Sequence, residues 1–392
     1  MIILSGGDNM KILKAYKFRM YPNKEQKEQI NKTLGCTRLV YNHYLEKKQT
    51  MYKENKKTIS CYDCIKDLSN LYNEYPFLKE IDSMSLRTSL FDLDNAYNKM
   101  FKEHAGYPKY KSKYDKNSYR TNYIKNTYKN KIYENIKLDL QNKTIILPKL
   151  KEVKIRGYRN LDSLNSRIIN ATVSKELDNS YYVSVCVEED IIQPIFKPIN
   201  IVGIDLGIKD LVITSDYMKY KNEQVIKKYE KRIKQKQRRL SKKEKGSHNY
   251  YKLKCLIARI YKKIRNARKY NIHQITKEIV DNNDIIVTET LNLKNMTKNH
   301  YIAKSLTDAS LSEILRQLEY KSKWKNKKMY KIETYYPSSQ ECSICGYKNK
   351  KMKDLSVREY ECPKCHNKLD RDYNAAINIM FEGVKKYMKG LV

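Results

Sequence analysis

Apolar positions near the start of the chain change from strand-like to helical spacing. Residues 12–20 have strand character, and Pro22 then ends the strand. Asn23 and Gln26, three residues apart, form the sequence pattern of a helix capping box. In the helix predicted to follow, apolar side chains recur at helical spacing at Ile30, Leu34, Tyr41 and Leu45.

Two further helices are predicted before a basic loop. One covers about residues 62–72 and the other about residues 83–104, where one face carries apolar side chains. The loop at residues 106–114 interleaves Lys with Tyr, so its lysines can meet phosphates while its tyrosines stack on bases. On local sequence alone, an exposed linker explains this loop equally well.

Strand patterns dominate residues 136–190. Residues 139–147 predict a hairpin that turns at Gln141 and Asn142, and a turn at residues 178–179 precedes a strand of alternating valines. We expect this block to join the strand at residues 12–20 in a small β-barrel. The proline-bounded residues 194–198 are expected to be a linker.

The second half of the chain is predicted to alternate strands with helices. It opens with a strand, a tight turn and a second strand over residues 201–214. The elements expected next are two long basic helices (223–243 and 250–281), a short buried strand (284–289), a helix (308–328), a strand (330–335), a cysteine-rich module and a final helix (373–389).

The charge of the chain points to a polyanionic partner. Lys and Arg number 80 against 44 Asp and Glu, which gives a formal net charge of +36. A net charge of magnitude ~2–8 suffices to keep a small domain soluble. AT-rich codons can explain part of the lysine excess, but the charge together with 35 tyrosines favours nucleic-acid binding. A membrane-surface role is disfavoured because the charge is spread over the whole chain.

Several protein classes are disfavoured by the same composition. No stretch approaches the ~18 apolar residues of a membrane span, and no secretory leader is recognisable. We therefore expect a cytoplasmic protein of two or three domains. Residues 1–9 look foreign to the fold, because Gly6-Gly7-Asp8 could encode a ribosome-binding site read in frame; the expected natural start is Met10.

Four of the nine cysteines have the spacing of a zinc ribbon. Two Cys-x-x-Cys pairs are separated by sixteen residues, a pattern in which four thiolates surround one Zn²⁺ tetrahedrally. His366 adjoins the second pair and is expected to be a bystander. Cys61 and Cys64 have no second pair and are expected to pack within a helix. The four ribbon cysteines are Cys342, Cys345, Cys362 and Cys365.

Acidic residues occupy positions where a buried charge needs a partner. Asp205 lies in the predicted strand pair at residues 201–214, and Glu289 ends the strand at residues 284–289. Asp370 and Asp372 open the last helix. Each alone has an ordinary explanation, since an Asp at a helix start is commonly a cap. Together, the order strand-Asp, strand-Glu, helix-Asp matches an RNase H-like nuclease, whose carboxylates hold two divalent metals.

The motifs together resemble the TnpB family, whose members are encoded by bacterial insertion sequences and are related to the type V CRISPR effector nucleases. The resemblance covers nearly the whole chain from Met10. It rests on Gly203-Ile-Asp-Leu-Gly207, Glu289-Thr-Leu-Asn-Leu293, the segments 336–345 and 370–378, and on the family-like segments 17–23, 106–113 and 146–150.

This resemblance implies a domain organisation. An α/β RNase H-like (RuvC) nuclease domain would occupy residues 199–340 and 367–392, with the zinc ribbon inserted at residues 341–366. An N-terminal wedge β-barrel, residues 10–22 and 136–195, would be interrupted by a helical recognition domain, residues 23–135.

The resemblance also implies a transposon-encoded RNA-guided DNA endonuclease. Asp205, Glu289 and Asp372 would be catalytic and hold two Mg²⁺ ions, while one structural Zn²⁺ would occupy the ribbon. A transposon-derived guide RNA and double-stranded target DNA would be the partners. The residues that we expect to contact nucleic acid are Lys109, Tyr110, Lys111, Lys113, Arg238 and Arg239.

Only one of the two aspartates that open the last helix can face the metal site. Residues two apart on a helix point about 200° away from each other, at ~3.6 residues per turn. Asp372 matches the catalytic position of the family motif. Asp370 is therefore expected to be a cap or a supporting group.

Two other functions remain open on the sequence. A relative without nuclease activity could act as an RNA-guided DNA-binding repressor, although all three acidic motifs are present here. A non-specific RNA-binding protein with a ribbon would leave those motifs unexplained. A tyrosine transposase is excluded, because the six histidines include no His-x-His motif.

Overall fold

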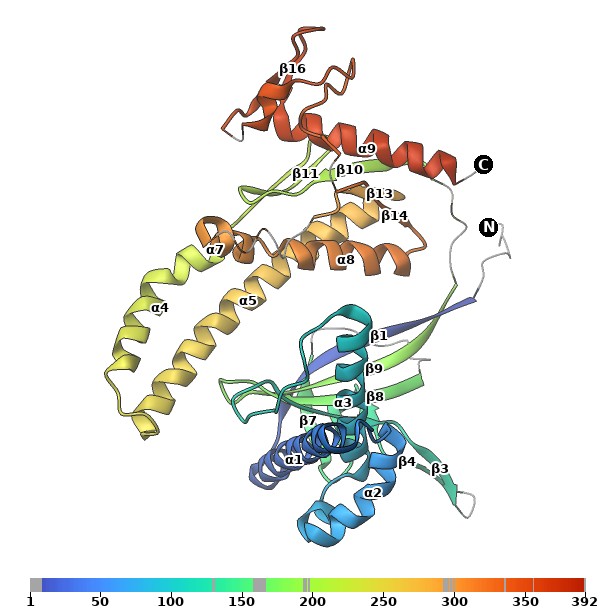
Figure 1. Cartoon of the computed structure of the whole chain (residues 1–392), viewed down its shortest axis with the longest axis vertical. Helices are drawn as coiled ribbons and strands as arrows, with labels where there is room; N and C mark the ends of the chain where they lie inside the picture. Colours follow the sequence, from blue (N-terminus) through green and yellow to red (C-terminus); the bar gives the residue numbers. More distant parts are fainter. Residues whose placement is uncertain are drawn as a thin grey trace. The chain divides into compact units, whose positions relative to one another are not determined.

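The computed structural model describes residues 9–390 except 129–130, 158–166, 193–195, 197, 292–295, 297, 299, 335 and 355. The chain forms two compact units, one comprising Met10–Ile191 and the other beginning at Ile192 (Figure 1). Each unit is described by itself. Residues 1–8 of the expected leader (residues 1–9) and most of the expected linker at residues 194–198 lie outside the described residues, while Asn9 is the first residue of β1 (Asn9–Tyr21). No helix in the described ranges is both long and apolar enough to cross a bilayer.

A seven-stranded sheet organises the first unit. The first strand pairs with strands from much later in the chain, as expected, because β1 lies between β9 and β7. The β5–β6 and β8–β9 hairpins are confirmed as well. In spatial order the strands are β2 (Asn117–Asn122), β8 (Arg167–Lys175), β9 (Tyr181–Ile192), β1 (Asn9–Tyr21), β7 (Lys151–Arg156), β6 (Thr144–Leu147) and β5 (Lys137–Asp139).

The sheet has two ends and is not a closed barrel in the described part of the chain. β2 and β5 stand at opposite ends of the strand order. One face buries a core of alternating apolar residues, to which the first helix adds Ile30 and Leu34. Because that helix covers the apolar face, the core is formed without the strand closure that we expected.

Helices α1 (Lys24–Asn55), α2 (Cys61–Glu74) and α3 (Ser83–Glu103) form a second core in this unit, with a short 3₁₀ segment η1 (Pro76–Glu80) between α2 and α3. The capping box is confirmed, because Gln26 N donates to the Asn23 side chain and Asn23 N donates to Gln26. Cys61 and Cys64 are buried among the apolar residues of this core, as expected.

The helical region is shorter than the expected range of residues 23–135. Its last helix ends at Glu103, and three strands follow: β2, β3 (Lys125–Tyr128) and β4 (Lys131–Glu134). In β2 the buried positions are Tyr119 and Thr121, which alternate with less buried polar residues. The sequence did not reveal this strand, because its two alternating buried residues, Tyr119 and Thr121, are not aliphatic.

A five-stranded mixed sheet organises the second unit. Strand β10 pairs antiparallel with β11 and parallel with β13, and β13 pairs parallel with β14. The strand order is β12 (Lys219–Lys221), β11 (Asp210–Thr214), β10 (Ile201–Asp205), β13 (Ile285–Thr288) and β14 (Lys328–Lys331).

Helices flank this sheet and extend beyond it. The two long basic helices are α4 (Val225–Ser241) and α5 (His248–Asn282), which pack on each other as a hairpin (Figure 1). The helix expected at residues 308–328 is present as α8 (Leu311–Trp324). A separate helix, α7 (His300–Ala309), precedes it and was not expected; Ser310 between the two helices is left-handed, with φ 53°.

The last helix, α9 (Arg371–Lys389), packs very closely on β10. A Cβ atom placed on Gly203 would lie 2.1 Å from the backbone oxygen of Ala376 and 2.5 Å from the backbone nitrogen of Met380. Only a residue without a side chain lets the backbones of helix and strand approach this closely. Gly203 therefore sets the depth at which α9 lies on the sheet.

Replacing Gly203 by Ala should destabilise the second unit. The new methyl group would meet backbone rather than a movable side chain, and overpacking of this kind typically costs about 1–3 kcal/mol. Urea denaturation would measure the loss. Gly35→Ala is the control, because its Cβ would meet nothing within 4 Å and Ala is favoured in a helix interior by about 0.5–1 kcal/mol. Equal stability changes in the two variants would contradict the close-packing argument.

Candidate active site and metal centre

Two of the expected catalytic carboxylates lie at the same edge of the sheet. β10 and β13 run parallel and pair Ile204 with Thr288. The residues that follow these partners are Asp205, the last of β10, and Glu289, which comes directly after β13. Parallel pairing in this register therefore places the two acidic side chains on adjacent strands at one end.

The third carboxylate comes from the start of α9. Asp372 is in the first turn of this helix, and Asp370 is its N-cap. Asp370 Oδ1 accepts hydrogen bonds from the backbone nitrogens of Asp372 and Tyr373, both at 3.1 Å, while Lys219 Nζ donates to its Oδ2 at 2.6 Å. The expected role of Asp370 as a cap is confirmed.

Asp205, Glu289 and Asp372 line one cleft of about 790 Å³ in the second unit, whereas Asp370 does not line it. All three side chains are partly buried. Basic groups also line the cleft, from the β10–β11 turn, the start of α4, the ribbon and the start of α9. They are Lys209, Lys227, Arg358 and Arg371.

The carboxylates repel one another. Burial, together with the negative charges of Glu289 and Asp372, raises the pKa of Asp205 to about 8. Burial also raises the pKa of Glu289. By contrast, although burial acts in the opposite direction, Lys219 and the backbone N–H groups hold the pKa of Asp370 below its usual value. The three cleft carboxylates therefore form a site that favours cations, while Asp370 already has its partner.

Three further residues support the site, although the sequence analysis did not single them out. Two contact the carboxylates directly, and the third connects α9 to the ribbon. Ser338 Oγ donates to Glu289 Oε1 at 2.5 Å, and Arg358 forms an ion pair with Asp372 at 3.6 Å. Arg371 is buried, and its Nη1 donates to the carbonyl oxygens of residues 354 and 357 in the ribbon. Position within a known motif was the only available signal, because Ser and Arg are common outside functional sites.

The donor set of the cleft fits hard divalent cations. Carboxylate oxygens are the ligands that Mg²⁺ prefers, and Mg²⁺ is commonly held by one or two carboxylates together with substrate phosphates. The mutual repulsion around Asp205 is what a bound cation would relieve.

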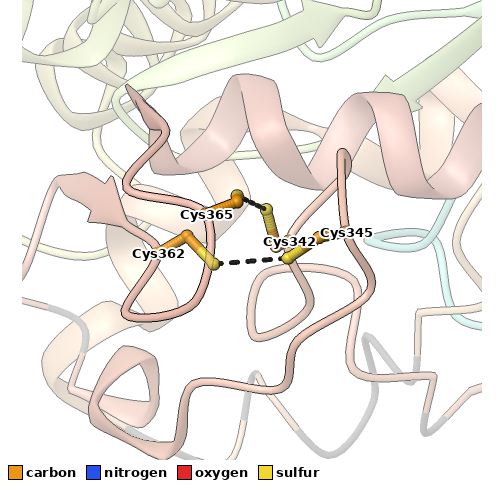
Figure 2. A group of neighbouring side chains, drawn as sticks. All are labelled: Cys342, Cys345, Cys362 and Cys365. Atoms are coloured by element: carbon orange, nitrogen blue, oxygen red, sulfur yellow. Dashed lines mark hydrogen bonds between the residues drawn. The ribbon is translucent and has the colours of Figure 1, made fainter.

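The four ribbon cysteines converge on one point (Figure 2). Their sulfur atoms all lie within 4.8 Å of one another, with 3.6 Å between Cys342 and Cys365 and 3.5 Å between Cys345 and Cys362. Sulfur ligands at ~2.3 Å from a tetrahedral Zn²⁺ would lie about 3.8 Å apart. In the described part of the chain, this is the one group of three or more potential ligand side chains that is so compact. The cluster can therefore hold a metal ion.

The two cysteine pairs sit on turns of the same form. Gly346 N donates to Cys342 O, and His366 N donates to Cys362 O, both at 2.9 Å. Gly346 and His366 occupy the same left-handed position, with φ 71° and 57°. His366 is outside the compact group of ligands, as expected for a bystander. The position of His366 directly after Cys365 is explained by this turn conformation and not by metal binding.

The residues expected to contact nucleic acid lie in both units. Lys109, Tyr110 and Lys113 are exposed in the loop after α3, and Arg238 and Arg239 are exposed on α4. Lys111 is different, since burial lowers its pKa and its Nζ lies 3.8 Å from the centre of the Tyr41 ring. In this structure Lys111 is therefore engaged with α1 and does not project into solvent.

Comparison with known proteins identifies the family. A family model described as "Probable transposase" matches residues 184–300, and one described as "Cas12f1-like, TNB domain" matches residues 312–379. The chain is 32% identical over 376 residues to "Putative RNA-guided DNA endonuclease" of Streptomyces pristinaespiralis, with 95% of this chain and 90% of that protein covered. The chain belongs to the TnpB family.

Other comparisons with this TnpB chain agree. It is 29% identical over 391 residues to "Putative RNA-guided DNA endonuclease InsQ" of Escherichia coli K12, covering 95% of this chain and 93% of that protein. Its fold is similar to that of Cas12f1 in a cryo-EM complex with sgRNA and target DNA, with a TM-score of 0.57 at 14% identity, covering 95% and 99% of the two chains. A model described as "Helix-turn-helix domain" matches residues 10–57, which form a strand followed by one long helix.

The raised pKa of Asp205 predicts a pH-dependent stability. Its folded pKa of about 8 lies above the ~3.9 of an unfolded Asp, so the folded state binds the extra proton between these values. Stability of the magnesium-free, zinc-loaded protein should therefore fall as pH rises from about 4 to 8, by up to about 1.4 kcal/mol per pH unit from this group. Asp205→Asn should flatten the dependence of Tm on pH and be the more stable at pH 8. Parallel curves for the two proteins would contradict the repulsion.

The cysteine geometry predicts a structural metal site. Four protein ligands leave no open coordination position, and binding of such a metal is coupled to folding. Cys362→Ser should therefore lower both the zinc content, measured by elemental analysis, and the Tm. Cys255→Ser, which changes a cysteine outside the ribbon, is the control and should change neither by a comparable amount. Full zinc content and an unchanged Tm in Cys362→Ser would show that the four-thiolate assignment is wrong.

Proposed function

We propose that this protein is a transposon-encoded RNA-guided DNA endonuclease that hydrolyses target DNA at the cleft of Asp205, Glu289 and Asp372. The observation that carries the proposal is the meeting of these three carboxylates, from β10, β13 and α9, at one solvent-open cleft. The proposal is supported by relatives named as RNA-guided DNA endonucleases, which the chain matches over 90% or more of their length.

The sheet supports assignment of the cleft to an RNase H-like nuclease. Numbered along the chain, its strands take the order 3-2-1-4-5, with strands 1 to 3 antiparallel and strands 1, 4 and 5 parallel. The resemblance implies carboxylates that come from strand ends and from a helix, and this strand order puts β10 and β13 side by side. The first strand occupies the centre, so an acidic residue at its end lies within reach of neighbours from both the sheet and α9.

The residues of the cleft have separable roles in the proposed reaction. Asp205, Glu289 and Asp372 would hold two Mg²⁺ ions, which would supply an activated water and stabilise the departing 3′ oxygen. Lys209 and Lys227 would attract the DNA backbone to the cleft. Arg358, whose side chain is 62% exposed, forms an ion pair with Asp372 at 3.6 Å.

Other parts of the chain have proposed roles in binding. Residues 10–22 and 136–195 would be the wedge, and the helices after β1 the recognition domain, for guide RNA and double-stranded target DNA. The ribbon cysteines would hold one Zn²⁺, consistent with the distances between their sulfur atoms. Phosphate and base contacts are proposed for Lys109, Tyr110, Lys113, Arg238 and Arg239, which are exposed, and for Lys111 if it leaves Tyr41.

An RNA-guided repressor is the rival function. It would need the nucleic-acid surfaces but not three converging carboxylates, whose mutual repulsion is unfavourable without a cation. The raised pKa of Asp205 is therefore the observation that favours hydrolysis over binding alone.

Cleavage of a target plasmid with guide RNA and Mg²⁺ tests the proposal, and two aspartate variants sharpen it. Asp372→Ala should abolish cleavage, because it removes a metal ligand, while guide and target binding stay intact. Asp370→Ala should reduce cleavage only partly, because it removes a helix cap worth about 1 kcal/mol. The reverse pattern would reassign the ligand. Target binding without cleavage by the unaltered protein would select the repressor.

A further inference from the structure

In the part of the chain that the structure describes, the hydroxyl group of Ser338 is the one recorded donor to the side chain of Glu289. Ser338 is 5% exposed, and its Oγ donates to Glu289 Oε1 at 2.5 Å. The bond occupies one carboxylate oxygen of Glu289, a residue that lines the cleft. A short bond from a buried hydroxyl to a carboxylate restricts rotation of the carboxylate and favours its charged form.

Two buried asparagines of α9 hold the turn that carries Ser338. Asn378 Nδ2 donates to the carbonyl oxygens of Ser338 and Glu341, both at 2.7 Å. Asn374, one helical turn earlier, donates from Nδ2 to the same Glu341 oxygen at 2.6 Å and accepts from Ser343 N at 2.9 Å. The backbone of residues 338–343 is therefore fixed at three points to the helix that presents Asp372.

The same turn runs directly into the metal cluster. Cys342 follows Glu341, and the Ser343 nitrogen that binds Asn374 belongs to the first cysteine pair. One hydrogen-bonded network thus connects α9, the first cysteine pair and Glu289. Asn374 and Asn378 are 0% and 5% exposed, so their amide groups have no water to replace these partners.

We propose that Ser338 is a positioning residue for Glu289, held in place by Asn378 and Asn374, and that the ribbon thereby helps to shape the catalytic cleft. The inference rests on the proposed function, in which Glu289 is a metal ligand. Ligands to metals are commonly oriented by such hydrogen-bonded partners, whose loss typically costs about 10–100-fold in metal affinity or activity. The structure supplies both the partner and the scaffold that holds it.

A set of single-residue variants separates this role from simple packing. Ser338→Ala removes the hydroxyl, and Ser338→Thr keeps it. Ser343→Ala is the matched control, because the Ser343 hydroxyl lies in the same turn and is buried without a hydrogen-bond partner. All variants are made in the full chain, with zinc bound.

Two readouts are needed, and one does not depend on cleavage. Mn²⁺ binding to the zinc-loaded protein, free of nucleic acid, is measured from the EPR signal of free Mn²⁺. Single-turnover plasmid cleavage is measured with guide RNA over a range of Mg²⁺ concentrations. Ser338→Ala should lose about 10–100-fold in one or both, with the loss of rate greatest at low Mg²⁺. Ser338→Thr should recover most of the loss, and Ser343→Ala should behave as the unaltered protein.

The outcomes are distinguishable. Ser338→Ala within about twofold of Ser343→Ala in both readouts overturns the inference. So does a loss of cleavage accompanied by lower zinc content and Tm but unchanged Mn²⁺ affinity, which indicates a purely structural role. If Ser338→Ala does not fold, Ser338→Cys, which keeps the size and weakens the donor, is judged by the same readouts. Failure of the unaltered protein to cleave overturns the proposed function instead.

Discussion

The close approach of α9 to the centre of the sheet is the constraint on which the cleft depends. With Gly203 in β10, the backbone of the helix lies against the strand, near Ala376 and Met380. A second glycine, Gly383, plays the same part against Val287 of β13. A helix seated this deeply brings a carboxylate from its first turn to the ends of two parallel strands. A side chain at residue 203 would lift the helix and separate Asp372 from Asp205.

That packing creates an electrostatic cost which only the function explains. Folding brings Asp205 next to two other carboxylates in a partly buried cleft, and the pKa of Asp205 rises as a result. Four basic side chains line the same cleft, yet they leave the rise in place. At the start of α9, by contrast, the Asp370 carboxylate accepts hydrogen bonds from the backbone and from Lys219, and its pKa lies below the usual value. The contrast between Asp205 and Asp370 separates a carboxylate that a cation would stabilise from one that already has its partners.

The ribbon serves as a second anchor for the cleft. Its turns depend on four sulfur atoms and on the buried Tyr360, whose hydroxyl donates to the carbonyl oxygens of Gln340 and Tyr347. From this small core, residues reach two of the carboxylates, through Ser338 to Glu289 and through Arg358 to Asp372. A module with few apolar residues can therefore hold the carboxylates of the cleft in place, because cysteine ligands to a metal would supply the stability that its small core lacks.

The sequence by itself determined the features whose physical signals are local. Cysteine spacing located the four sulfur atoms, the Asn23–Gln26 capping box located the start of α1, and helix geometry showed that Asp370 and Asp372 could not share one site. Acidic residues at the ends of apolar strands marked the candidate cleft. Only the tertiary structure decided the contacts between distant segments, such as Ser338 with Glu289, Lys219 with Asp370 and Lys111 with Tyr41. The open strand order of the first sheet, within the described residues, and the strand β2 were likewise decided by packing. Such contacts depend on which faces meet after folding, and a single residue type or a local period carries no record of its distant partner.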